Sequence, residues 1–188
     1  KGTEFEHQWM KDSKKFNSKT KIKEMSDYIK VNSIAWSIQY IEAELIDEIN
    51  IRQAVHRGMH NSIRDIITRY PVNSHETFLL IDGNDFRPFT IFNDTTEELY
   101  NIPHETITGG DNKYTAIAAA SILAKVARDE YIHDLCVQYP ELDEKYNLNK
   151  NQGYGTKHHL NGILEHGITQ WHRKTYGRCK EAKLNIIV

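Results

Sequence analysis

The chain has 188 residues, a formal net charge of −2, and 39% hydrophobic and 27% charged residues. These values are typical of a folded globular protein, exclude a chain that is disordered throughout, and suit one domain over residues 1–188. The near-neutral charge also excludes a strong positive field over the whole surface. Any binding of nucleic acid must therefore come from local basic groups.

The cysteines, the histidines and the hydropathy indicate in which cellular compartment the protein works and which kinds of site it lacks. Cys136 and Cys179 are far apart and lack a pairing or zinc-ligand pattern, which is typical of a reducing environment. His158-His159 lacks the spacing of a helical zinc site, so we expect both side chains on an exposed face. No apolar run approaches the roughly 18 residues of a membrane span, and no charged and then apolar leader opens the chain. We expect a cytoplasmic protein without membrane contact.

The N-terminal region carries the densest basic run, with six lysines between Lys11 and Lys23. An exposed segment that leads into a helix explains this run without any ligand. Ser18 is a suitable N-cap for that helix, which we expect to end near Lys30.

Three elements are predicted next. Residues 31–41 are rich in β-branched and aromatic residues with loose alternation, which predicts a strand. Residues 42–49 suit a short helix. Apolar residues recur at helical spacing through residues 51–69, and Tyr70-Pro71 ends that helix.

The middle of the chain holds two predicted strands. The continuous apolar run at residues 77–81 is typical of a buried interior strand, and residues 105–108 suit a second strand. Between them, residues 86–104 predict a loop with little regular structure beyond a helical turn near residues 96–100.

A long helix is predicted after Gly109-Gly110, since two glycines permit a sharp entry of the backbone. Its residues are apolar on nearly every side, so we expect it to be buried, with Asp111 at its start. It runs to about Tyr139, because Pro140 cannot continue it.

The C-terminal region closes the predicted order of elements. Residues 142–155 predict irregular structure. Thr156 is expected to cap a last helix that ends near His166 and is closed by Gly167. Strands separated by helices predict an α/β fold in which helices flank a sheet.

Asp82 and Asp111 share a position in this order, because each follows a predicted strand. Ligand sites in α/β sheets gather at the carboxyl ends of strands, and carboxylate oxygens suit Mg²⁺. A pair of such ions can activate a water for phosphodiester cleavage. Two simpler explanations stay open at this point: a turn at Asp82-Gly83, and a helix cap at Asp111.

Three further segments could bind nucleic acid. Tyr154 lies between two glycines and could offer its ring to a sugar or a base, although a turn explains the pattern as well. Lys14 and Lys15 could position a phosphate. Residues 172–174 could do the same, although a basic terminus is an ordinary feature.

Seven short motifs follow one another in a distinctive order. They are Asp-Ser-Lys-Lys (12–15), Ile-Asp-Glu-Ile-Asn-Ile (46–51), Leu-Ile-Asp-Gly (80–83), Gly-Asp-x-Lys-Tyr (110–114), Ala-Ala-Ser-Ile-Leu-Ala-Lys-Val-x-Arg-Asp (119–129), Gly-Tyr-Gly-Thr (153–156) and His-Arg (172–173). Together they resemble ribonuclease HII, the type 2 ribonuclease H, over nearly the whole chain. The helix motif and the 46–51 box are the most specific, and they favour type HII over type HIII.

The resemblance implies an RNase H-like mixed sheet flanked by helices. It also implies hydrolysis, dependent on Mg²⁺ or Mn²⁺, of the RNA strand of RNA–DNA hybrids. Ribonucleotides embedded in duplex DNA would be cut on their 5′ side, leaving a 3′-hydroxyl and a 5′-phosphate. Asp82 matches a metal-binding carboxylate of the family, and Asp111 matches its last catalytic acid.

The resemblance also implies contacts with the substrate. Tyr154 matches a tyrosine that packs against the deoxyribose beside the ribonucleotide. Lys14, Lys15 and Lys125 fall in motifs that lie near the substrate backbone, and Arg173 of the last motif is expected to bind substrate as well. We expect a monomer.

One motif of the family is not found. Ribonuclease HII opens with a strand that carries Asp-Glu-x-Gly-Arg-Gly, which supplies two of its four carboxylates and the backbone that senses the ribose 2′-hydroxyl. Residues 1–11 do not contain this motif. We therefore expect the first strands to precede Lys1 in the intact protein, and little or no cleavage by the 188-residue chain.

Two other functions stay open. A catalytically inactive RNA–DNA hybrid-binding module would keep the lysines and Tyr154 but need no metal. Finding Asp-Glu-x-Gly-Arg-Gly upstream of Lys1 would argue for the enzyme. Another nuclease of the RNase H fold, such as a resolvase, would have no reason to carry the 46–51 box.

Overall fold

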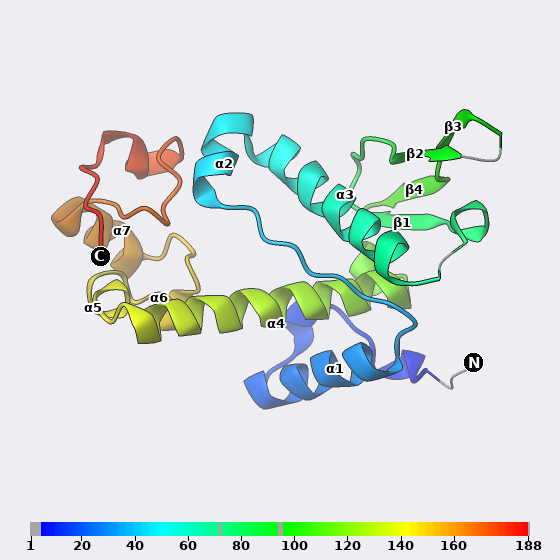
Figure 1. Cartoon of the computed structure of the whole chain (residues 1–188). Helices are drawn as coiled ribbons and strands as arrows, with labels where there is room; N and C mark the ends of the chain where they lie inside the picture. Colours follow the sequence, from blue (N-terminus) through cyan, green and yellow to red (C-terminus); the bar gives the residue numbers. More distant parts are fainter. Residues whose placement is uncertain (1–4, 72, 94–95, 188) are drawn as a thin grey trace. The chain divides into compact units, whose positions relative to one another are not determined.

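The computed structural model describes residues 5–71, 73–93 and 96–187 (Figure 1). By proximity of its α-carbons the chain divides into two compact units. The first unit comprises residues 1–39 and 58–126, and the second comprises residues 40–57 and 127–188. The expectation of a single domain stays a prediction.

In the first unit, helix α1 packs against the first half of α4. Helix α1 (Lys19–Asn32) begins at Ser18, whose side chain accepts a hydrogen bond from the Lys21 amide, as predicted for an N-cap. Its buried Ile22 and Ile29 join a cluster with residues of α4 (Thr115–Gln138). The α4 members of this cluster are Ala119, Ile122, Leu123 and Val126.

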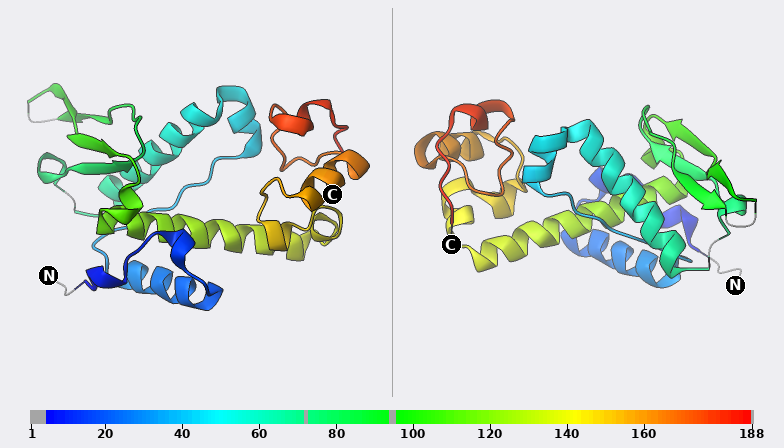
Figure 2. Two further views of the ribbon diagram at one scale, coloured as in Figure 1. Left: turned by 180° about the vertical axis from the view of Figure 1, so that it is seen from behind. Right: turned by 45° about the horizontal axis from the view of Figure 1, so that its top comes forward.

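The same unit contains two small sheets (Figures 1 and 2). Strands β1 (Leu79–Asp82) and β4 (His104–Ile107) form a parallel pair, and β2 (Thr90–Asn93) and β3 (Glu98–Asn101) form an antiparallel pair. The buried residues Ile81, Phe86, Phe89 and Ile102 pack against the part of α3 (Ile51–Arg69) that belongs to this unit. The mixed α/β class is confirmed.

The strand predicted at residues 31–41 is wrong. Helix α1 continues to Asn32, and residues 35–42 pair with no described strand. Trp36 and Ile38 instead pack against the cluster between α1 and α4. The Trp36 indole donates to the Lys30 carbonyl, and Arg69 donates to the Trp36 carbonyl. The apolar residues therefore serve helix packing, which a β-like composition does not reveal.

The loop predicted at residues 86–104 is also wrong where the structure describes it. This segment contains the β2–β3 hairpin, and residues 98–100 are strand rather than a helical turn; residues 94 and 95 lie outside the described part. Each strand has four residues, and exposed positions alternate with partly buried ones in β2. Strands this short give little periodicity to detect.

The second unit is helical. Helices α2 (Ala43–Ile49), α5 (Glu141–Tyr146), α6 (Leu148–Asn151) and α7 (Lys157–His166) join parts of α3 and α4. Leu142 and Tyr146 lie at the centre of its core and are fully buried. Thr156 caps α7 and Gly167 follows its end, as predicted.

Irregular structure was predicted at residues 142–155, and this is wrong because α5 and α6 occupy most of the segment. Asn147 and Gln152 adopt left-handed φ values of 56° and 53°, and these residues divide the segment into short helices that give no periodic signal in the sequence.

Among the described residues, no helix has both the length and the apolar character that crossing a membrane requires.

Candidate active site

Asp82 is the last residue of β1, and Asp111 follows the parallel neighbour of that strand. Asp82 pairs in register with Ile107, the last residue of β4, and the Gly83 amide donates to the Ile107 carbonyl at 3.0 Å. Beyond β4 the chain turns back, and the Gly110 amide donates to Asp82 Oδ1 at 2.9 Å. The backbone beside Asp111 is therefore bonded directly to the Asp82 carboxylate.

Two glycines make this return possible. Gly109 has a φ of +65°, a left-handed conformation that side chains disfavour. At Gly110 a Cβ would lie 2.4 Å from Cδ1 of the buried Ile117 and 3.4 Å from Asp82 Oδ1. A side chain at Gly110 would thus push against the core under the turn that presents Asp111.

Asp111 lies in a single turn of 3-10 helix, Gly110–Asn112. Helix α4 begins at Thr115, so Asp111 belongs to a separate turn and not to the start of α4. Its Oδ1 accepts a hydrogen bond from the Asn112 side chain at 2.9 Å, and the residue is partly buried.

Helix α4 is mostly buried in the half that belongs to the first unit, but Ala116, Ala120 and Ala124 form an exposed stripe there. The expectation of burial on nearly every side is wrong there.

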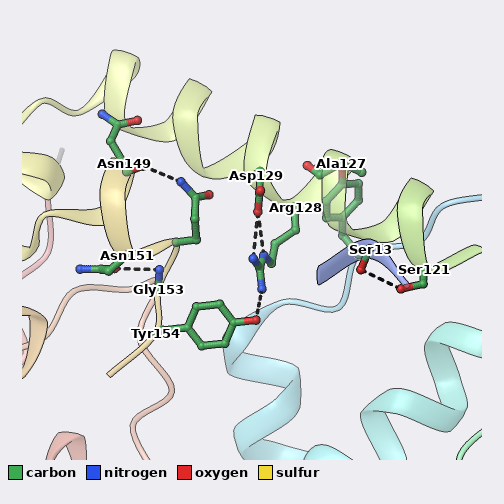
Figure 3. Close-up of polar contacts among 11 residues, drawn as sticks. Ser13, Ser121, Ala127, Arg128, Asp129, Asn149, Asn151, Gly153 and Tyr154 are labelled. Atoms are coloured by element: carbon green, nitrogen blue, oxygen red, sulfur yellow. Dashed lines mark hydrogen bonds and ion pairs between the residues drawn. The ribbon is translucent and has the colours of Figure 1, made fainter. Parts of the chain in front are cut away.

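A pocket of about 170 Å³ adjoins the Asp111 turn. Asp12 and Lys15 line it together with Asp111, and the Lys15 ammonium donates to the Asn112 side chain. The Asp12 carboxylate accepts from the Lys14 amide at 2.9 Å, and this bond lowers the pKa of Asp12. Asp12 precedes and Lys15 ends a single 3-10 turn, Ser13–Lys15, which contacts α4 through the Ser13 hydroxyl, 2.9 Å from that of Ser121 (Figure 3).

The two carboxylates at the carboxyl ends of β1 and β4, those of Asp82 and Asp111, suit the binding of one hard cation but are too few for a site with several protein ligands. The described residues contain no group of three or more His, Cys, Asp or Glu side chains placed to hold a metal ion. Mg²⁺, however, is commonly bound through one or two carboxylates together with water and substrate phosphates. Asp82 and Asp111 match that smaller donor set, and Lys15 adds a positive charge beside Asp111.

In the second unit, Tyr154 presents an exposed ring, with 62% of its surface accessible. The Arg128 guanidinium lies 4.8 Å from the ring centroid, and its Nη1 donates to the Tyr154 hydroxyl at 2.8 Å (Figure 3). Asp129 holds the same guanidinium by two hydrogen bonds. Sequence reasoning missed Arg128 as a neighbour of Tyr154, although the Arg-Asp end of the helix motif contains it.

Arg173 also belongs to the second unit, where its guanidinium lies 4.1 Å from the Tyr176 ring centroid. The next two amides, of Lys174 and Thr175, donate to the Asp47 carboxylate of α2. Lys125 lies on α4 in the first unit and is partly buried. The structure therefore places the proposed backbone contacts in both units.

The exposed face predicted at His158-His159 is wrong for one of the two residues. His158 is exposed, but only 6% of the His159 surface is accessible. Its ring contacts the Tyr154 carbonyl and the ring of His172. A doublet on an amphipathic helix places neighbours about 100° apart, so one can face the core while the other faces water.

Comparison with known proteins decides the family, since the sequence model for ribonuclease HII matches residues 2–179. The chain belongs to the ribonuclease HII family. Its similarity to the ribonuclease HII of Bacteroides thetaiotaomicron is 37% identity over 183 residues, covering 97% of this chain and 81% of that protein. The ribonuclease HII of Parabacteroides distasonis is 39% identical over 173 residues, covering 92% of this chain and 76% of that protein.

Membership of the ribonuclease HII family confirms the resemblance drawn from the seven motifs. It identifies the chain as a hydrolytic ribonuclease of the H class, in a family of metal-dependent enzymes that act on nucleic acid. In this family the edge that carries Asp82 and Asp111 is the candidate for the metal-binding site.

Proposed function

We propose that the protein is an endonuclease that hydrolyses the RNA strand of RNA–DNA hybrids and cuts on the 5′ side of ribonucleotides embedded in duplex DNA. Mg²⁺ or Mn²⁺ would be its cofactor. The observation that carries the proposal is the hydrogen bond from the Gly110 amide to Asp82. It brings the turn of Asp111 to the carboxyl end of β1, where a phosphate and a cation can meet two carboxylates.

Asp82 and Asp111 would hold the metal. Together with the further carboxylates expected before Lys1, they would serve a mechanism that uses two ions, in which bound cations activate a water and stabilise the departing oxygen. The Gly110 amide keeps one oxygen of Asp82 oriented, so the carboxylate needs little rearrangement on binding. The expectation that further carboxylates lie before Lys1 stays a prediction.

The remaining candidates would position the duplex. Lys15 lies beside the Asp111 turn, where its positive charge would meet a phosphate near the cleaved bond. Lys14 and Lys125 belong to the same unit and would contact the substrate backbone. The exposed ring of Tyr154 would pack against a sugar, and Arg173 would bind the backbone. Each unit thus supplies substrate contacts of its own.

The test is cleavage of a labelled duplex with one ribonucleotide in Mg²⁺ or Mn²⁺, with a chelator control. It would use the 188-residue chain and the chain extended by the upstream reading frame. In the extended chain we expect Asp82→Asn and Asp111→Asn to reduce nicking by more than about 100-fold, because even residues that merely orient metal ligands contribute 10- to 100-fold. Asp27→Asn on the exposed side of α1 is the matched control and should cut normally. Normal nicking by both site variants would refute the assignment.

The alternative function, an RNA–DNA hybrid-binding module without activity, predicts the opposite result in this cleavage test. It would bind the duplex equally well with and without chelator, and no form of the chain would cut it. Family membership favours the enzyme. The proposals of a monomer and of a cytoplasmic location are testable by light scattering and by fractionation of the source cells.

A further inference from the structure

Two histidines of the second unit form a buried pair that the proposed chemistry does not use. His159 lies on α7, and His172 lies in the segment after it. Their Nε2 atoms are 3.1 Å apart, and their ring centroids are 5.3 Å apart. The ring of Tyr146 packs edge-on against His172 at 4.9 Å. The pair contacts the backbone of Tyr154 through His159.

The partners of the two rings determine where their protons are. His159 Nδ1 lies 3.0 Å from the Tyr154 carbonyl, which can only accept, so this nitrogen carries a proton. His172 Nδ1 accepts from the Thr169 amide at 3.1 Å, so its proton is on Nε2. His172 Nε2 therefore donates to His159 Nε2. The hydrogen bonds run in one direction, from Thr169 through both rings to the Tyr154 carbonyl.

Both rings are neutral in this arrangement. A second proton on His159 would face the N–H group of His172, and a second proton on His172 would face the amide of Thr169, whose hydroxyl also lies 2.9 Å from this nitrogen. Burial lowers the pKa of both imidazoles, and for His172 the neighbouring His159 adds to the effect and the pKa falls to about 4. The tautomers inferred from the partners are thus the neutral forms that burial favours.

The chain of bonds ends at a segment whose conformation needs support. Gly153 has a φ of +78°, and the Tyr154 ring is mostly in solvent, so burial of the ring cannot fix it. The Tyr154 carbonyl accepts from both His159 and the Thr156 amide, the latter at 2.8 Å. Arg128 holds the hydroxyl at the other end of the side chain. Hydrogen bonds therefore hold Tyr154 both at its backbone carbonyl and at its side-chain hydroxyl.

We propose that His159 is a positioning residue for substrate binding, that it holds the Tyr154 backbone through Nδ1, and that His172 fixes its ring and tautomer. This inference rests on the proposed role of Tyr154 as a substrate contact. The pair acts through Tyr154 and touches no reacting atom.

A matched pair of variants separates this role from general stability. The amide nitrogen of Asn can take the place of Nδ1, so His159→Asn keeps the bond to the Tyr154 carbonyl and loses the one to His172. The amide oxygen of Gln reaches the place of Nε2 and can accept from His172, so His159→Gln keeps the bond to His172 and loses the one to Tyr154. Each variant loses one buried hydrogen bond, and their melting temperatures should be similar.

The experiment uses the chain extended by the upstream reading frame, and it measures KM and kcat on the duplex with one ribonucleotide and the affinity for that duplex in chelator. We expect His159→Gln to raise KM and weaken binding about 3- to 10-fold, the effect of one lost hydrogen bond, with kcat nearly unchanged. His159→Asn should stay within about twofold of the parent. By the same logic, His172→Gln, which can still donate to His159, should perturb KM less than His172→Asn.

A second background makes the result specific to Tyr154. In Tyr154→Ala, which should itself raise KM, His159→Gln should have no further effect on KM. Equal KM values for the Asn and Gln variants at position 159 would overturn the inference and leave the proposed function intact. A normal KM for Tyr154→Ala would overturn both the inference and the proposed role of Tyr154, while nicking that depends on Asp82 would still support the nuclease.

Discussion

The Gly110 amide donates a 2.9 Å hydrogen bond to the Asp82 carboxylate, although 28 residues separate the two in sequence. Parallel pairing of β1 and β4 is what allows it, since both strands end at the same edge. The contact also places a requirement on Gly110 itself, because the turn lies against the buried Ile117. The packing under the site can therefore be tested separately from its carboxylates.

We expect Gly110→Ala to destabilise the protein by about 1–3 kcal/mol, the usual cost of an added methyl in a packed position. Its Cβ would lie 2.4 Å from Ile117 Cδ1, so either Ile117 or the turn must move. If the turn moves, the Asp82 bond is lost and nicking falls with stability. Urea unfolding and the nicking assay would be measured on the same preparations.

The partner substitution Ile117→Val removes the clashing methyl and by itself should cost about 0.5–1.5 kcal/mol. The double variant should be more stable than the sum of the two changes implies. Gly155→Ala is the stability control, since its Cβ would only touch Leu160 at an ordinary 3.8 Å. Strict additivity of Gly110→Ala and Ile117→Val would contradict the proposed clash.

Arg128 should contribute to substrate binding through Tyr154. Arg128→Gln removes the cation over the ring and the hydrogen bond to the hydroxyl, and we expect KM to rise about 3- to 10-fold. Lys150→Gln, at an exposed position of the same unit, removes the same charge without touching Tyr154 and is the control. If both variants raise KM equally, the effect is one of net charge and not of the contact.

The sequence predicted the elements whose local signals are long or unambiguous. Nineteen residues of helical spacing predicted α3, and Thr156 and Gly167 marked the two ends of α7. The apolar run before Asp82 predicted β1 with Asp82 at its end, and the strand predicted at residues 105–108 predicted that Asp111 would follow a second strand. These inferences succeed because each depends on residues that are close in sequence.

The parts that sequence reasoning missed depend on distant contacts. The strands of the β2–β3 hairpin are too short to show a two-residue hydrophobic period. Trp36 lies in a segment of β-like composition, but it packs against the cluster between α1 and α4 and is not part of a strand. The contact of Arg128 with Tyr154 joins residues 26 apart, and that of His159 with His172 joins residues 13 apart. No local pattern reports such pairs, since only the folded chain brings them together.

Asp47, in the 46–51 box, should stabilise the segment that carries Arg173. It accepts from the amides of Lys174 and Thr175. Burial acts to raise the pKa of Asp47, but the hydrogen bonds from Thr175 and Lys174 outweigh it, and the pKa lies below its ordinary value of 3.8. This stabilisation is present above pH 3.8 and is lost as the pH falls through the lower pKa of the folded state.

The corresponding variant is Asp47→Asn, whose amide can accept fewer of these bonds. We expect it to lower the free energy of unfolding at pH 7 by about 1 kcal/mol, allowing for solvent screening. The difference from the parent should shrink near pH 3. Glu48→Gln, at an exposed position of α2, serves as the control. A constant difference between pH 7 and pH 3 would show that the Asp47 charge is not responsible.

The buried histidine pair predicts a second pH dependence, of opposite sense to that expected of an ion-paired histidine. Burial lowers the pKa of His172 from 6.5 to about 4, with the neighbouring His159 as the second cause. Below pH 6.5 the unfolded chain therefore binds a proton that the folded protein does not, and stability falls as the pH falls from 6.5 toward 4. Above pH 7 both states are neutral at this residue, and the contribution no longer changes.

His172→Gln isolates this effect, because glutamine does not titrate and can still donate to His159. Between pH 7.5 and 5 the free energy of unfolding of the parent should fall by about 2 kcal/mol more than that of the variant. Within residues 5–71, 73–93 and 96–187, the groups in contact with His172 are the rings of His159 and Tyr146 and the backbone and hydroxyl of Thr169, and none of these is a carboxylate that could hold a protonated ring. Urea unfolding at several pH values would measure both curves. Parallel curves would contradict this prediction, because they would mean that His172 is protonated as readily in the folded protein as in the unfolded chain.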